Sequence, residues 1–188
     1  DCPYLFFEDF SEVESFNSND EYGFSSAGSK SPHTFLAGWS AARAGAQAGT
    51  AIRIACRRET GLANYSARAD SPLLSGLKEK KTVSLDIRYD YSMNREGKPK
   101  ISQTVYFGYI TTPENPKSGD DTGTFPTSFT VNETTGSYTN INHTASATLS
   151  GVSAPLRLSW RTVPETNWGA NNNTCWFYID NIRVKIKK

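Results

Sequence analysis

Three carboxylates near the two ends of the chain are the residues with the clearest potential for chemistry. Glu8 and Asp9 lie in the aromatic-rich run 5–10, and Asp180 lies in the similar run 175–188. Because the first and last strands of many secreted β-sandwiches pair antiparallel, we expect Glu8 or Asp9 to lie opposite Asp180. Carboxylates that meet in this way repel one another unless a cation or a hydrogen-bond network holds them. One interpretation is a structural Ca²⁺ held by Glu8, Asp9 and Asp180, since this ion takes oxygen ligands. The other is that Asp9 and Asp180 bond loop amides and bind no metal.

Two tryptophans lie in loop-like surroundings that suit a binding site. Trp168 stands in an asparagine-rich loop with Asn171 and Asn172, and Trp39 precedes a glycine- and alanine-rich stretch that contains Arg43. A pyranose ring has apolar C–H faces rimmed by hydroxyls, so an exposed aromatic ring beside planar polar groups can hold a sugar. We therefore predict a ligand site from Trp168, Asn171, Asn172, Trp39 and Arg43. The alternative is that the two rings fold back to cap the domain, and this is the favoured interpretation for Trp39.

Catalytic signatures are missing from the sequence. His33 and His143 share no metal-ligand spacing, and there is no nucleophile elbow, zinc-binding helix motif, phosphate loop or dinucleotide fingerprint. Asp86 and Asp90 would lie about 13 Å apart on one strand face, with Arg88 between them. This arrangement is more typical of a solvated, charge-balanced surface than of a glycosidase carboxylate pair. A non-catalytic protein is favoured, with glycoside hydrolysis as the alternative.

The rest of the chain reads as short strands separated by turns. Apolar and polar residues alternate most regularly in 83–91, 50–57, 104–110 and 155–163, and more weakly in 127–131 and 145–149, which are expected at sheet edges. No stretch longer than about two turns has helical periodicity. These features predict one domain over 1–188, an all-β, two-sheet antiparallel sandwich of jelly-roll type with little helix. The predicted core includes Val83, Leu85, Ile87, Leu156, Leu158 and Trp160.

Charge and hydropathy limit the partners and the location. The chain has 20 Lys and Arg against 19 Asp and Glu, which argues against a nucleic-acid or anionic-membrane surface. No run approaches the roughly 20 apolar residues of a membrane span. Many Ser, Thr, Asn and aromatic residues favour an exported protein, and a chain that starts almost directly in a strand is expected to have lost a signal segment or a preceding domain.

Cys2, Cys56 and Cys175 form an odd set, so at least one thiol is unpaired within the chain. Cys56 closes an alternating apolar pattern and is expected to pack as a small buried side chain. The expectation is three free cysteines.

Four short motifs of the chain belong together: Phe-Phe-Glu-Asp-Phe at 6–10, a Trp followed by a Gly-led strand in 38–54, a Ser-Pro-Leu element in 68–74 and an Ile-Asp-Asn-Ile segment in 178–184. They resemble motifs of jelly-roll carbohydrate-binding modules and MAM adhesion domains of bacterial secreted or surface proteins. The last motif is similar to the closing strand of these domains, with Asn181 in place of the second acid.

The resemblance implies a glycan-binding domain with a structural calcium, located at the cell surface, for example in a lipoprotein, or in the medium. Its partner would be a glycan or oligosaccharide, and no nucleic acid is expected. Two alternatives are an adhesion domain that contacts protein, and an accessory domain of a hydrolase.

Overall fold

The computed structural model describes residues 3–12, 38–42, 44–47, 51–57, 67–96, 103–111, 122–131, 140–164 and 174–188. Within these ranges the chain forms strands and no helix, as the alternating patterns predict. The strands are β1 (Phe6–Glu8), β2 (Ser40–Ala42), β3 (Ala44–Gln47), β4 (Ala51–Arg57), β5 (Ala67–Asp70), β6 (Val83–Glu96), β7 (Gln103–Ile110), β8 (Thr124–Val131), β9 (His143–Val152), β10 (Arg157–Pro164) and β11 (Thr174–Ile186). None of these described residues belongs to a helix long and apolar enough to span a membrane.

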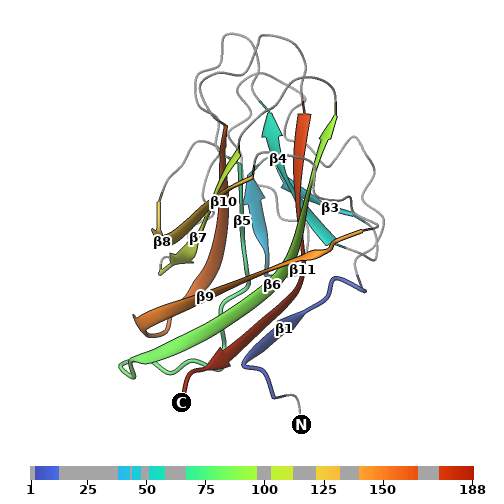
Figure 1. The fold of residues 1–188 in the computed structure, drawn as a ribbon. Coiled ribbons are helices and arrows are strands. Elements are labelled where there is room, and N and C mark those ends of the chain that lie inside the picture. Colours follow the sequence, from blue (N-terminus) through green and yellow to red (C-terminus); the bar gives the residue numbers. More distant parts are fainter. Residues whose placement is uncertain are drawn as a thin grey trace.

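The strands form two antiparallel sheets that lie as separate layers (Figure 1). The larger sheet has the order β3-β4-β11-β6-β9, and β1 pairs with β11 beside this path. The smaller sheet has the order β2-β5-β10-β7-β8. The predicted two-sheet antiparallel sandwich is confirmed. Among the described strands, β8 and β9 end their sheets, so the two weakly alternating segments are edge strands, as expected.

The core lies between the two layers and is filled by the alternating residues. Leu85 and Ile87 of β6 and Leu158 and Trp160 of β10 are buried, as is Leu156, and Val83 is partly buried against them. Aromatic rings join the layers: the Tyr89 ring of β6 meets the Trp160 ring of β10 edge-on, with centroids 5.5 Å apart. The six predicted core residues therefore all pack in or against the core.

The pairing of the first and last strands is also confirmed, but its register differs from the expected one, by one residue for Asp9 and by two for Glu8. Phe6 pairs with Val184 and Glu8 pairs with Ile182, so neither Glu8 nor Asp9 lies directly opposite Asp180. A bulge in β11 lies next to this pairing: its register against β6 shifts between Asp180 and Arg183, and Asn181 adopts a φ of 49°. An extra residue in one strand displaces everything beyond it, and asparagine tolerates this left-handed conformation better than most residues do.

Candidate functional site

The outer face of the larger sheet displays charged and hydroxyl side chains because the strands alternate. On β11, Ile182 and Val184 face the core, so Arg183 and Lys185 face outward. On β6, Leu85 and Ile87 face the core, so Asp86 and Arg88 face outward. Register places Arg183 opposite Arg88 and Lys185 opposite Asp86, which gathers these four side chains on two neighbouring strands.

Three adjoining hollows cross this face, and together we call them the outer groove. The central hollow, of ≈ 260 Å³, is lined by Tyr4, Asp86, Arg88, Arg183 and Lys185. Asp86 and Arg88 also line a hollow of ≈ 360 Å³ that extends to β9, together with Ile87, Ser146, Ala147 and Thr148. Tyr4 and Lys185 also line a hollow of ≈ 440 Å³ at the other end, with Pro3, Leu5, Ile186 and Lys188. The groove thus runs from the segment 3–5, which precedes β1, across β11 and β6 to β9.

Aromatic rings stand at the β1 end of the outer groove. The rings of Tyr4 and Phe7 stack with centroids 5.8 Å apart and an interplanar angle of 23°. The Lys185 ammonium lies 4.8 Å from the Tyr4 ring centroid, within the range of a cation–π contact. Phe7 is 45% exposed although it is large and apolar, and it lies opposite Arg183 in register. The exposed Phe7 ring therefore adjoins the Tyr4 end of the groove, on the strand next to Arg183.

Hydrogen bonds fix the polar side chains along the groove. The Thr148 hydroxyl donates to Asp86 Oδ1 at 2.9 Å, and the Thr144 hydroxyl donates to Asp90 Oδ1 at 2.9 Å. Arg183 Nη2 also donates to Asp90 Oδ1 at 2.9 Å. These bonds hold both carboxylates in defined positions and leave further lone pairs to accept hydrogen bonds from a ligand.

The carboxylates predicted to hold calcium lie near one another but do not form a metal cage. Glu8 accepts from the Phe10 amide at 2.8 Å, and Asp9 accepts from the Ser11 hydroxyl at 2.7 Å. Asp180 accepts from the Asn181 amide at 2.7 Å. The part of the chain that the structure describes contains no group of three acidic, histidine or cysteine side chains placed to hold a metal ion. These bonds match the alternative interpretation, in which nearby amides satisfy the acids, and calcium stays a prediction.

The pKa of the Asp180 carboxyl is raised to about 6, mainly by burial, and the neighbouring carboxylates of Asp90, Asp9 and Glu8 contribute to the rise. The Asn181 amide opposes this effect but does not cancel it. Burial likewise raises the pKa of Glu8. The acidic cluster is thus a place where negative charge is only partly compensated.

Trp39 is not a ligand platform. Its ring is 1% exposed and packs between Phe10, at 5.4 Å between centroids, and Trp160, at 6.2 Å. The capping interpretation of this residue is correct, because Trp39 directly precedes β2 and its ring closes the core. The other predicted ligand residues, which are Trp168, Asn171, Asn172 and Arg43, lie outside the described residues.

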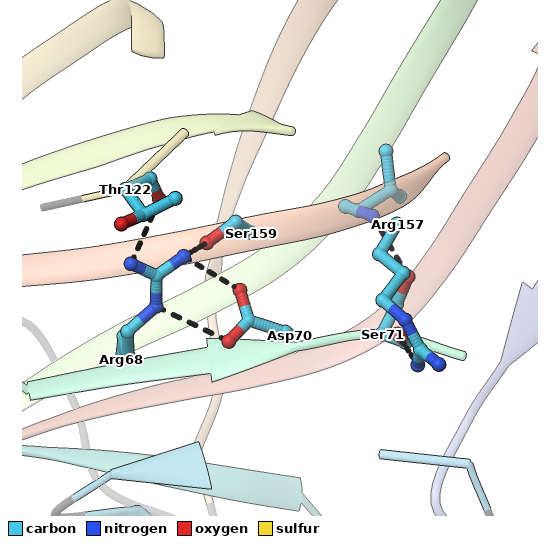
Figure 2. Close-up of polar contacts among 7 residues, drawn as sticks. Arg68, Asp70, Ser71, Thr122, Arg157 and Ser159 are labelled. Atoms are coloured by element: carbon cyan, nitrogen blue, oxygen red, sulfur yellow. Dashed lines mark hydrogen bonds and ion pairs between the residues drawn. The ribbon is translucent and has the colours of Figure 1, made fainter. Parts of the chain in front are cut away.

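A buried ion pair on the smaller sheet was not predicted. Arg68 and Asp70 of β5 are both 0% exposed, and Arg68 Nη2 lies 2.9 Å from Asp70 Oδ1 (Figure 2). Arg68 also donates to the Ser159 hydroxyl at 2.9 Å and to the Thr122 carbonyl oxygen at 2.9 Å. Burial raises the pKa of the Asp70 carboxyl, and the Arg68 guanidinium opposes that rise. Because Thr122 and Ser159 belong to other segments, Arg68 holds the loop at Thr122 and strand β10 to β5.

A second polar contact anchors the Ser-Pro-Leu element that follows β5. The Ser71 amide donates to the Leu158 carbonyl oxygen at 2.8 Å, and the Leu158 amide donates back to the Ser71 hydroxyl at 2.9 Å. Arg157 Nη1 donates to the carbonyl oxygens of Ser71, at 3.0 Å, and Gly38, at 2.8 Å. Figure 2 shows Arg157 beside Ser71 and apart from the Arg68 pair. These contacts are structural, since they satisfy backbone groups and join neighbouring segments.

Comparison with known proteins gives distant structural likenesses. No protein-family model matches the chain, and no curated protein matches it in sequence. Among solved structures, the chain is similar to TmCBM61, solved in complex with β-1,4-galactotriose, with a TM-score of 0.34 and 10% sequence identity. The likeness covers 91% of this chain and 97% of that chain. At this TM-score and identity no residue can be transferred, so a function has to be argued from the groove itself.

Proposed function

We propose that the protein is a non-catalytic glycan-binding domain and that the outer groove is its binding surface. The observation that carries the proposal is the exposed Phe7 ring, stacked on Tyr4 and placed beside Arg183 at one end of a groove lined by charged and hydroxyl groups. A sugar ring offers apolar C–H faces and a rim of hydroxyls. An aromatic face with fixed donors and acceptors next to it complements both parts of such a ligand.

The polar side chains of the groove favour binding over chemistry. Asp86 in the groove and Asp90, which is bonded to the groove residue Arg183, each accept a threonine hydroxyl. Carboxylates held in this way are acceptors for ligand hydroxyls, and charge-assisted hydrogen bonds are the strong ones. Arg88 and Lys185 add donors on the same surface. The groove thus presents both kinds of hydrogen-bonding group that a polyhydroxylated ligand requires.

The expected affinity is modest. An aromatic contact is worth about 0.5–1.5 kcal/mol beyond the area that it buries. The hollows are open to solvent and desolvate few ligand atoms, so a single domain is expected to bind in the micromolar to millimolar range. A polymer that presents many repeats to several domains would be held more tightly.

The test is affinity electrophoresis in gels that contain soluble polysaccharides, β-1,4-galactan among them, preceded by a glycan-array screen. The wild-type protein should be retarded by at least one glycan, and Phe7→Ala should lose most of that retardation. Leu73→Ala is the matched control, because Leu73 is also a large apolar residue, 43% exposed, and lies outside the groove. Equal retardation of Phe7→Ala and the wild type would overturn the assignment of the groove.

A second candidate function is protein contact at the cell surface. Ile186 is 47% exposed and lines the end of the groove next to Tyr4, and an exposed aliphatic side chain suits a protein surface better than a sugar hydroxyl. This function would be favoured if the protein binds nothing on the glycan array and if Ile186→Ser loses a protein contact that the wild type makes.

We also propose that the protein is exported, to the cell surface or the medium, since a surface glycan or protein is the partner of both candidate functions. The composition, rich in Ser, Thr, Asn and aromatic residues, supports this location. Fractionation of cells that produce the full-length protein tests it: recovery in the cytosol alone would contradict it.

A further inference from the structure

Strand register brings two of the three cysteines directly opposite each other. In the β4–β11 pair, Cys175 is the partner of Cys56 within an uninterrupted run from Thr174↔Arg57 to Ile179↔Ile52. The two residues are far apart in the sequence, and the sequence patterns alone predicted three free thiols. Their juxtaposition follows only from the way β4 and β11 pair.

The backbone positions meet the distance requirement for a disulfide. Directly opposite residues of an antiparallel pair have Cα atoms about 4.5 or 5.5 Å apart, depending on the hydrogen-bonding pattern. Both values fall within the range of about 4.4–6.8 Å that disulfides span. Opposite residues also belong to the same side of the sheet.

The two positions are on the core-facing side of their strands. Cys56 has the same parity as Ile52 and Ile54, which are buried in the core. Cys175 has the same parity as Phe177 and Ile179, which are buried in the core as well.

We propose that Cys56 and Cys175 form an intrachain disulfide and that Cys2 stays a free thiol. The two thiols would each give up a proton and together two electrons. A disulfide oxidant, such as an oxidised dithiol oxidoreductase or oxidised glutathione, would be reduced to two thiols. The new S–S bond would join the start of β11 to the end of β4.

The test is a peptide map of the full chain. The folded protein is treated with oxidised glutathione, then denatured in iodoacetamide without reductant and digested with trypsin. Lysine and arginine positions place Cys56 in peptide 54–57, Cys175 in 162–183 and Cys2 in 1–30, so the three cysteines separate. The expected product is a species that joins 54–57 to 162–183 and disappears on reduction, with alkylated Cys2.

Two variants make the result specific. Cys2→Ser should keep the linked species and contain no titratable thiol, whereas Cys56→Ser should lose the link and keep both remaining thiols reactive. Carbamidomethyl or glutathione adducts on both Cys56 and Cys175 of the wild-type protein would overturn the proposal. A link that includes Cys2 would overturn it too. The proposal stays testable even if a variant fails to fold, because the deciding peptide map is made on the wild-type chain.

Discussion

Arg183 Nη2 lies 2.9 Å from Asp90 Oδ1 and joins β11 to β6 at the bulge where the register of the two strands shifts. The same carboxylate accepts from Asn181 Nδ2 at 3.1 Å on its other oxygen. Asp90 therefore stands between two regions of the larger sheet. Arg183 belongs to the outer groove, and Asn181 belongs to the acidic cluster of Glu8, Asp9 and Asp180.

The acidic cluster predicts a pH-dependent stability. Asp180 has a folded-state pKa of about 6, above its ordinary value of 3.8, so the folded state binds the proton more tightly than the unfolded state. Unfolding then releases a proton between these two values, and stability falls as pH rises through this window. The stability that the protonated Asp180 carboxyl adds is fully present below pH 3.8 and is lost above about pH 6.

Asp180→Asn should remove this dependence. Urea unfolding at a series of pH values should give midpoints for the wild type that fall, relative to those of the variant, as pH rises from about 4 to about 6.5. Parallel midpoints across that range would show that Asp180 titrates normally.

The calcium hypothesis makes a separate prediction. If Glu8, Asp9 and Asp180 hold Ca²⁺, the added stability is RT ln(1 + [L]/Kd), about 2.7 kcal/mol at a hundredfold excess over Kd. Chelator should then lower the melting temperature at neutral pH, where Asp180 is ionised, and Asp180→Ala should abolish the response. A melting curve that neither chelator nor added Ca²⁺ moves would contradict the hypothesis.

The buried ion pair of the smaller sheet predicts a large effect of single substitutions. Asp70→Ala leaves the Arg68 guanidinium buried without its carboxylate, and breaking a buried pair in this way costs about 3–5 kcal/mol of unfolding free energy. Asp86→Ala is the control, because Asp86 is exposed and its removal should change stability by no more than about 0.5 kcal/mol.

The double variant Arg68→Met with Asp70→Leu should be less destabilised than Asp70→Ala, because no buried charge is left alone. Equilibrium unfolding in urea measures all three variants. If the double variant is at least as unstable as Asp70→Ala, the cost lies in lost packing and not in an unpaired charge.

Trp168 provides a second prediction about binding. If its ring is a sugar platform with Asn171 and Asn172, Trp168→Ala should lose glycan affinity while its stability changes by no more than about 0.5 kcal/mol. If Trp168 caps the sandwich, the variant should instead unfold at clearly lower denaturant. Measuring affinity and stability on the same preparation separates the two interpretations.

Strand alternation predicted much of the fold from the sequence. Residues such as Leu85, Ile87 and Leu158 lie where their period-2 pattern places them, because one face of each strand is buried. The pairing of the first and last strands was predicted too. Its register was not, since the bulge at Asn181 leaves no signal in an alternating pattern.

The site was harder to predict for physical reasons. All four residues of β5 are buried, so the alternation that identifies an outer face is absent there, and the buried position of Arg68 could not be read from its charge. The outer groove gathers side chains from the segment 3–5 and from strands β6, β9 and β11, which are distant in sequence. A signal that could have pointed to it is Phe7, a large apolar residue at the one outward position of β1.

The most direct test of the central claim is a map of ligand contacts by NMR. The ¹⁵N-labelled protein is titrated with the glycan that the array identifies, and shifts of the backbone amides are followed. The account predicts shifts concentrated at Phe7, Arg183 and Arg88 and at their neighbours on β1, β11 and β6, and their loss in Phe7→Ala. Shifts confined to the segment around Trp168, with those strands unmoved, would contradict it.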